Sequence, residues 1–199
     1  ILKGTITSDV TLAAGNTYKL SGEYIVEEGA PLHIEEGVKI IAVYDDIADY
    51  ILVKQGGKIN AVGTPDKPIV MTSEKEEPGA WGGIHICGRA HTNAEGGKGS
   101  SEIGGAVYGG NDDADNSGTL QYIRLEYTGF AFDEEHEANG ISFYGVGNGT
   151  IVDHCQAYKG SDDGFEFFGG SVNVSNLVAV SCSDDSFDWT EGWNGKVTN

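Results

Sequence analysis

The sequence predicts an all-β protein that winds into a parallel β-helix, a solenoid with coils of roughly 22–27 residues. Three observations support this prediction. Short β-rich runs alternate with turns rich in Gly and Asp, similar segments recur at a steady interval, and no stretch of a dozen residues has apolar positions at helical spacing. Stacked coils bury the inner face of each coil against the next. An antiparallel sandwich would need hairpin turns about every 8–12 residues, and it would not produce similar segments at a steady interval.

The repeat can be followed along the chain. Near the N-terminus, "VEEGAPLHI" from Val26 matches "VKQGGKINA" from Val53 at an interval of 27 residues. Further on, "GGIHICG" (82–88) has the same shape as "NGISFYG" (139–145). The clearest match joins "GSDDGFEFFGG" (160–170) to "CSDDSFDWTEG" (182–192), 22 residues later. Each of these last two segments is an acidic turn followed by an aromatic strand, which predicts one corner and one strand of a stacked coil.

Alternation within the repeated strand assigns its side chains to two sides. The apolar positions are expected to point inward: Ile84, Ile86, Ile141, Phe143, Phe165, Phe167, Phe187 and Trp189. The positions between them form two outward ladders. The first contains His85, Ser142, Glu166 and Asp188, and the second contains Cys87, Tyr144, Phe168 and Thr190. Neighbouring rungs are expected about 4.8 Å apart.

We interpret residues 1–199 as a single domain with two insertions. Residues 89–118 form a Gly-rich insertion, and residues 129–138 form a shorter acidic one. Long loops inside a compact domain are usually functional or disordered. The acidic run of the second insertion (Asp133, Glu134, Glu135 and Glu137) is interpreted as a solvated charged surface. The chain ends in "WNGKVTN", where a further coil is expected to begin, so we predict that the solenoid is truncated there.

The composition limits the partners. There are 31 acidic residues against 12 Lys and Arg, a formal net charge of −19, which disfavours nucleic acid and anionic membranes but not divalent cations. Three cysteines without a CxxC pair do not indicate a disulfide scaffold or a zinc site. The sequence contains no run of 18 apolar residues, so no transmembrane segment is expected.

Several long motifs resemble a known family. They are "GTITSDVTLAAGNTYKLSG", "GKINAVGTPDKPIVMTS", "WGGIHICGRA", "YGGNDDADNSGTLQYIRLEY" and "NGISFYGVGNGTIVDHCQAYKGSDDGFEFFGG". Together they are similar to secreted or outer-membrane-attached β-helix proteins of Bacteroidetes-type bacteria. The resemblance implies a right-handed parallel β-helix with an architecture similar to pectate lyases, and an extracellular or surface location. It implies no established reaction.

The paired aspartates of the repeat are the first candidate metal ligands. Asp162 and Asp163 occupy the same corner as Asp184 and Asp185 one coil later, so their carboxylates are expected to converge. Calcium suits such a cluster, because it binds about six to eight oxygen ligands in irregular geometry. The alternative is that each Asp caps its own turn by accepting backbone N–H groups.

A second candidate calcium loop is "DADNSG", residues 113–118, which matches the opening of an EF-hand loop. Its twelfth position is Arg124 rather than a bidentate Glu, so a true EF-hand is excluded. A loop stabilised by calcium through Asp113 and Asp115, with Asp112 beside them, remains open.

The sequence supports three classes of function. The outward residues His85, Ser142, Tyr144, Glu166, Phe168 and Asp188 suggest an adhesive or glycan-binding strip. The alternative for Tyr144 and Phe168 is that the first insertion covers them as a satellite core. A polysaccharide-degrading enzyme would use Glu166 and Asp188, although the ladder supplies no Lys or Arg as a lyase base. A structural subunit would stack end to end into filaments through its uncapped ends.

Overall fold

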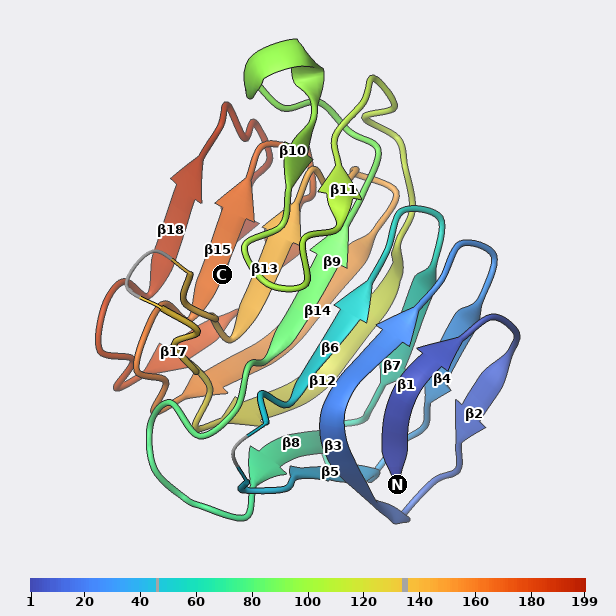
Figure 1. Cartoon of the computed structure of the whole chain (residues 1–199), viewed down its shortest axis with the longest axis vertical. Helices are drawn as coiled ribbons and strands as arrows, with labels where there is room; N and C mark the ends of the chain where they lie inside the picture. Colours follow the sequence, from blue (N-terminus) through green and yellow to red (C-terminus); the bar gives the residue numbers. More distant parts are fainter. Residues whose placement is uncertain (46, 134–135) are drawn as a thin grey trace.

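The computed structural model describes residues 1–45, 47–133 and 136–199. In Figure 1 the coils stack side by side from the blue N-terminal end to the red C-terminal end. Nearly every strand pairs in parallel with a strand one coil away, in one continuous sheet wound around a central core. The predicted parallel β-helix is therefore confirmed.

Each coil contributes to three faces, which we number in the order in which the chain visits them. Face 1 contains β1 (Leu2–Ile6), the second half of β3 (Thr17–Val26), β6 (Tyr50–Val53), β9 (Ile84–Cys87), β13 (Ile141–Tyr144), β15 (Phe165–Phe168) and β18 (Phe187–Thr190). Face 2 contains β2 (Val10–Leu12), β4 (Pro31–Ile34), β7 (Lys58–Val62), the first halves of β12 (Gly118–Glu126) and β14 (Ile151–Tyr158), β16 (Val174–Ser175) and β19 (Val197–Thr198). Face 3 contains the first half of β3, β5 (Lys39–Ala42), β8 (Ile69–Ser73), the second halves of β12 and β14, and β17 (Val178–Val180).

The register follows the sequence repeat. Phe165 pairs with Phe187 across the interval of 22 residues, and Val26 pairs with Val53 across the interval of 27. On the outer side of face 1, Glu166 pairs with both Ser142 and Asp188. Both predicted outward ladders are therefore in register.

Single residues in the left-handed conformation bend the long strands from face 2 to face 3. Tyr122 in β12 and His154 in β14 both have a φ of 51°, and their rings stack at 4.5 Å on adjacent coils. Asn176 has the same φ at the next coil. Each bend lets one strand serve two faces, since left-handed residues turn the chain sharply.

The core is a continuous column of apolar side chains inside the solenoid. Phe143 stacks on Phe167 at 5.0 Å, and Phe165 stacks on Phe187 at 5.6 Å. Trp189 has the predicted inward register, opposite Phe167 in the last strand of face 1, but its side chain is 62% exposed and does not join the buried core. The ring that stacks on Phe167 is that of Trp193, at 4.5 Å.

The first insertion packs against the outer side of face 1. It contains a short 3₁₀ turn, η1 (Glu95–Gly97), and an antiparallel hairpin of β10 (Gly99–Ser100) and β11 (Val107–Tyr108). Together with face 1 it buries a second apolar cluster: Tyr50, Leu52, Cys87, Ile103, Ala106, Tyr108, Ala138, Tyr144 and Phe168. No helix in the described part of the chain is long and apolar enough to cross a membrane.

Candidate cation site

A small cavity of about 220 Å³ opens on the outer side of face 1, beside the second apolar cluster. We call it the acidic pocket. Every described residue that lines it is a carboxylic acid: Glu102, Glu137, Asp162, Asp163, Glu166, Asp184 and Asp188. Such a concentration of like charge is unfavourable unless protons, hydrogen bonds or a cation compensate it.

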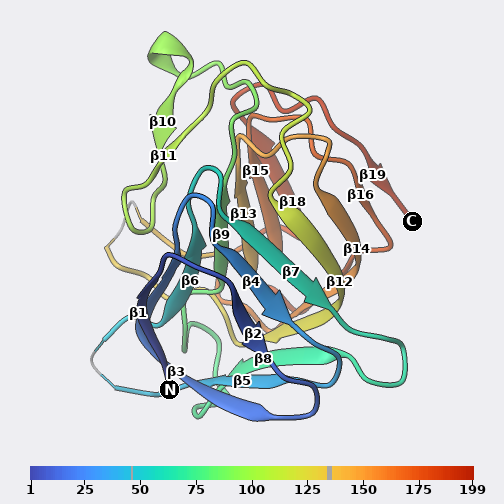
Figure 2. The same ribbon diagram turned by 90° about the vertical axis from the view of Figure 1, so that its right-hand side faces the viewer.

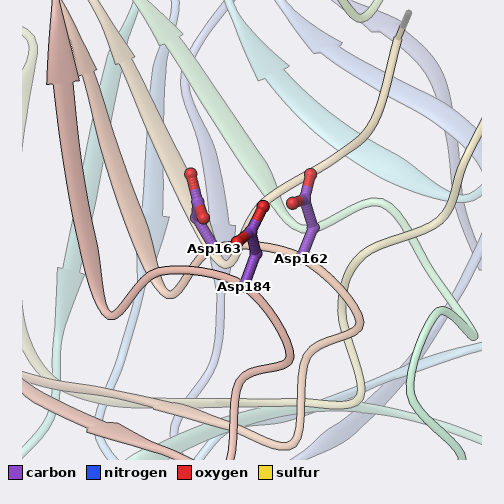
Figure 3. A group of neighbouring side chains, drawn as sticks. All are labelled: Asp162, Asp163 and Asp184. Carbon is purple, nitrogen blue, oxygen red and sulfur yellow. The ribbon is translucent and has the colours of Figure 1, made fainter. Parts of the chain in front are cut away.

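The repeat itself places the central members of this pocket. Asp162 and Asp163 lie in the turn before β15, and Asp184 lies in the equivalent turn before β18. Because β15 and β18 pair in parallel, these two turns are adjacent, and Figure 3 shows the three carboxylates gathered at one corner. Glu166 and Asp188 then point outward from opposite positions in the two strands.

Two overlapping groups of carboxylates have the geometry for a metal ion. The oxygens of Asp162, Asp163 and Asp184 lie within 4.8 Å of one another, and so do those of Asp163, Glu166 and Asp188. Asp163 belongs to both groups and is almost fully buried. An ion near Asp163 could therefore recruit ligands from either group.

Burial and mutual repulsion perturb these acids. Burial, with smaller contributions from neighbouring carboxylates, raises the pKa of Asp162 to about 6 and that of Asp163 to about 7. The same causes raise the pKa of Glu166 to about 9 and that of Glu102 to about 7. Asn139 Nδ2 donates a hydrogen bond to Glu166 Oε2 at 2.5 Å, which only partly offsets the shift. Without a cation, these pKa values leave Glu166 protonated, and Asp163 and Glu102 partly protonated, at neutral pH.

The sequence of the chain matches a known protein family. A family model described as a pectate-lyase-like beta helix domain matches residues 4–199. The chain belongs to this family. No curated protein and no solved structure matched the chain. Membership of the pectate-lyase-like β-helix family accounts for the architecture, whereas a function has to be argued from the site.

The acidic pocket is poorly suited to the polysaccharide chemistry of an enzyme. Pockets that enclose small organic ligands usually measure about 300–1,000 Å³, and this one is smaller. A protonated Glu166 beside Asp188 resembles an acid and a nucleophile of a glycosidase. However, the described lining contains no Lys, Arg or His that could serve as a lyase base or hold an acidic sugar. The space fits an ion with a few waters better than a sugar ring.

The other aspartates predicted to bind calcium, Asp185, Asp113 and Asp115, lie outside the two carboxylate groups of the acidic pocket. Asp185 stays outside both carboxylate groups, and its backbone N–H donates to Asp163 Oδ1 at 2.8 Å. Asp113 Oδ1 accepts the backbone N–H of His91, and Asp115 Oδ2 accepts that of Arg89. Within the described residues these two carboxylates join no group of three metal-ligating side chains. They hold the start of the first insertion, as turn-capping aspartates do.

The open aromatic strip expected on face 1 is not present. Tyr144 is fully buried and stacks on Phe168 at 4.4 Å, and the ring of Tyr108 from the first insertion lies 5.2 Å from that of Tyr144. His85 and Ser142 are fully buried as well. The alternative that the first insertion covers Tyr144 and Phe168 as a satellite core is therefore correct, because the insertion folds back over both rings. Of the six residues expected to form the strip, Glu166 and Asp188 are the two that line the acidic pocket.

Sequence reasoning missed two members of the pocket, Glu102 and Glu137. They come from the two insertions, which have no counterpart in the repeat and hence no register to place them. Glu137 is exposed, as expected for a solvated charged run, and it also lines the pocket. In the same run Asp133 pairs with His136 at 2.7 Å, whereas Glu134 and Glu135 lie outside the described residues.

Proposed function

We propose that this pectate-lyase-like β-helix protein binds calcium in the acidic pocket, as a stabilising ion of an extracellular or surface-attached protein. The observation that carries the proposal is the pair of carboxylate groups that share Asp163, each within 4.8 Å. Calcium accepts about six to eight oxygen ligands in flexible geometry, whereas magnesium requires nearly ideal octahedral coordination. Zinc prefers nitrogen and sulfur ligands, which the described lining lacks.

The ion would fasten parts of the chain that are far apart in sequence. The acidic pocket joins Glu102 of the first insertion and Glu137 of the second to the corners of the β15 and β18 coils. A single cation there neutralises repulsion among four segments at once. Its binding free energy adds directly to the stability of the folded chain, because the unfolded chain has no preformed site.

The location proposed for the protein agrees with this chemistry. Extracellular calcium modules typically bind with dissociation constants of about 10⁻⁴–10⁻³ M, where the ion is abundant. A net charge of −19 also suits a soluble surface that recruits cations. We propose an adhesive or glycan-binding role for the outer surface of this calcium-stabilised solenoid. The small volume of the acidic pocket argues against the enzyme alternative, and no observation on the described residues favours the filament alternative, so we propose neither.

Thermal unfolding in excess calcium and in EGTA tests the proposal. Saturation at about 100 times the dissociation constant contributes about 2.7 kcal/mol, which corresponds to a rise in Tm of about 5–10 °C for a chain of this size. Asp163→Asn, which changes the ligand shared by both carboxylate groups, should remove most of that rise. Asp185→Asn is the matched control from the adjoining corner, and its rise should equal that of the wild type. An equal rise in both variants, or none in the wild type, would overturn the proposal.

A further inference from the structure

A second and larger cavity lies on face 2, on strands that the acidic pocket does not touch. It measures about 600 Å³ and spans the outer side of β2, β4 and β7, the three strands seen side by side in Figure 2. Its lining is Thr11, Ala14, His33, Ile34, Glu35, Glu36, Asn60, Val62, Gly63 and Thr64. We call it the face 2 groove. Its volume lies within the range that small organic ligands occupy.

The floor of the groove is a ladder of polar side chains. Thr11 pairs with His33, and His33 pairs with Asn60, so the three occupy equivalent outward positions on adjacent coils. Neither the Thr11 hydroxyl nor the Asn60 amide makes a hydrogen bond to another described residue, and His33 has only Asp9, with Nε2 and Oδ2 3.7 Å apart. Both donors and acceptors are therefore available at intervals of about 4.8 Å.

The walls of the groove are held by the corners of the coils. Glu35 Oε2 accepts the backbone N–H of Ala14 at 2.8 Å. Lys67 Nζ donates to Glu36 Oε1 at 2.8 Å, and its backbone N–H donates to Thr64 Oγ1. These bonds fix the corners in place, so the groove needs little reorganisation to receive a ligand. The exposed methyl groups of Ala14 and Val62 add apolar patches between the polar groups.

This combination selects a chemical class of ligand. The rim carboxylates of Glu35 and Glu36, together with the overall negative charge, disfavour anions. No described group of metal-ligating side chains lies in the groove, which argues against an inorganic cation. What remains is a neutral molecule with many hydroxyl groups and apolar C–H faces. The ladder repeats at about the length of one sugar unit in an extended chain.

We propose that the face 2 groove binds a neutral oligosaccharide that runs across β2, β4 and β7, with hydroxyl groups hydrogen-bonded to Thr11, His33 and Asn60. This gives the glycan-binding role a place other than the buried ladder of face 1. The groove is independent of the acidic pocket, because none of its lining residues belongs to that pocket. Binding at the groove therefore does not require calcium.

Isothermal titration with neutral hexasaccharides tests this inference, using cellohexaose, laminarihexaose, mannohexaose and xylohexaose, each in calcium and in EGTA. Hexagalacturonate is the acidic counterpart. At least one neutral chain should bind equally in both buffers, and Asn60→Ala should weaken it about tenfold, which is the loss expected for one hydrogen-bonding side chain. Thr11→Val, which keeps the shape and removes the hydroxyl, should weaken binding similarly.

The matched control is Gln156→Ala, an outward amide on face 3 that makes no hydrogen bond to another described residue. Its affinity should equal that of the wild type, and circular dichroism should show that all variants fold. The inference is overturned if none of the neutral hexasaccharides binds, or if Gln156→Ala weakens binding as much as Asn60→Ala. It is also overturned if binding occurs only with hexagalacturonate in calcium, which would assign recognition to the acidic pocket. Failure of the thermal test in calcium leaves this result unaffected.

Discussion

Asp163 connects two successive coils: its Oδ1 accepts the backbone N–H of Asp185 at a distance of 2.8 Å. The same carboxylate belongs to both groups of potential metal ligands. A turn cap and a cation ligand are therefore compatible roles for one side chain, because a carboxylate offers about four lone-pair sites. Asp163 thus has a structural role, as acceptor for the Asp185 N–H, and a proposed second role as a calcium ligand.

Replacement of Asp163 tests that separation. Asp163→Asn keeps an oxygen for the Asp185 N–H and removes one like charge, so stability in EGTA should be unchanged or higher. The calcium-dependent rise in Tm should be lost. Asp163→Ala removes the acceptor as well and should cost about 0.5–1.5 kcal/mol in EGTA, the net contribution of one hydrogen bond that is only partly buried. Denaturant unfolding in both buffers measures these effects, and a full calcium response in Asp163→Asn would contradict the assignment.

The acidic pocket also predicts how stability depends on pH. A carboxyl group whose pKa is raised in the folded state binds protons more tightly there, so its contribution to stability is lost as pH rises from the unfolded pKa through the folded pKa. The pKa values of about 6 for Asp162, about 7 for Asp163 and about 9 for Glu166 place that loss between about pH 4 and 9. In EGTA, Tm should fall across this range.

Calcium should reverse that trend, because the ion replaces protons and is held best by ionised carboxylates. Its stabilising effect should therefore grow from pH 5 to pH 8, values that bracket the lower two pKa values. Thermal unfolding at both pH values, with calcium and with EGTA, measures it. A Tm in EGTA that rises over the same range would show that the pocket does not control stability.

Much of this site was predictable from the sequence, for a specific physical reason. In a parallel solenoid, an offset in sequence becomes an adjacency in space, so the match of Asp162 and Asp163 to the turn with Asp184 predicted their meeting. The alternation that placed Glu166 and Asp188 outward depends only on the pleat of the strand. Local pattern and global fold agree at these positions.

The insertions were the part that the sequence could not place. Residues 89–118 fold back over face 1, and nothing in their Gly-rich pattern specifies that Ile103 and Tyr108 would bury Tyr144. For the same reason Glu102 could not be assigned to the pocket. Trp189 and Trp193 show a further limit. Trp189 has the inward register, yet the ring that packs on Phe167 is that of Trp193, and the repeat does not specify this contact.

Tyr144 distinguishes a packing role from a ligand-binding role. The side chain is fully buried in the second apolar cluster. Tyr144→Ala should therefore lower the free energy of unfolding by about 3–5 kcal/mol, as large-to-small core substitutions do. Chemical denaturation measures it, with the exposed Tyr44→Ala as a control that should change little. A loss below about 0.5 kcal/mol would mean that the insertion does not cover this ladder.

Asp49 is a buried acid outside the pocket. Its Oδ1 accepts the backbone N–H of Gly22 at 2.5 Å, while its buried Oδ2 has no partner among the described residues. Burial raises the pKa of Asp49 to about 6, so its ionisation destabilises the fold as pH rises from about 4 through 6. Asp49→Asn keeps the Oδ1 acceptor and should raise stability at pH 8 by about 2 kcal/mol, with little gain at pH 4. Equal effects at both pH values would contradict this account.

His91 ties the first insertion to the turn after β18. Its Nδ1 lies 2.7 Å from Asp113 Oδ1 and its Nε2 lies 2.9 Å from the Gly192 carbonyl oxygen. Both partners are acceptors, so both nitrogens must carry protons, and the pKa of His91 is raised by Gly192 first and by Asp113 second. Its contribution is present below about pH 6.5, the unfolded value, and is lost as pH rises through the folded pKa.

His91→Ala should consequently reduce stability more at pH 6 than at pH 9. The difference should be about 1 kcal/mol or less, because the ring is 31% exposed and solvent screens the pair. A double-mutant cycle with Asp113→Asn at both pH values isolates the interaction. A coupling free energy that does not change with pH would show that the imidazolium is not the relevant form.

Anomalous diffraction from crystals grown with calcium chloride tests the central claim most directly, since it locates the ion rather than its effect. We predict a calcium peak bounded by the carboxylates of Asp162, Asp163 and Asp184, or by those of Asp163, Glu166 and Asp188, with oxygen distances of about 2.3–2.6 Å. Calcium peaks confined to other parts of the surface, with this corner free of anomalous signal, would contradict it.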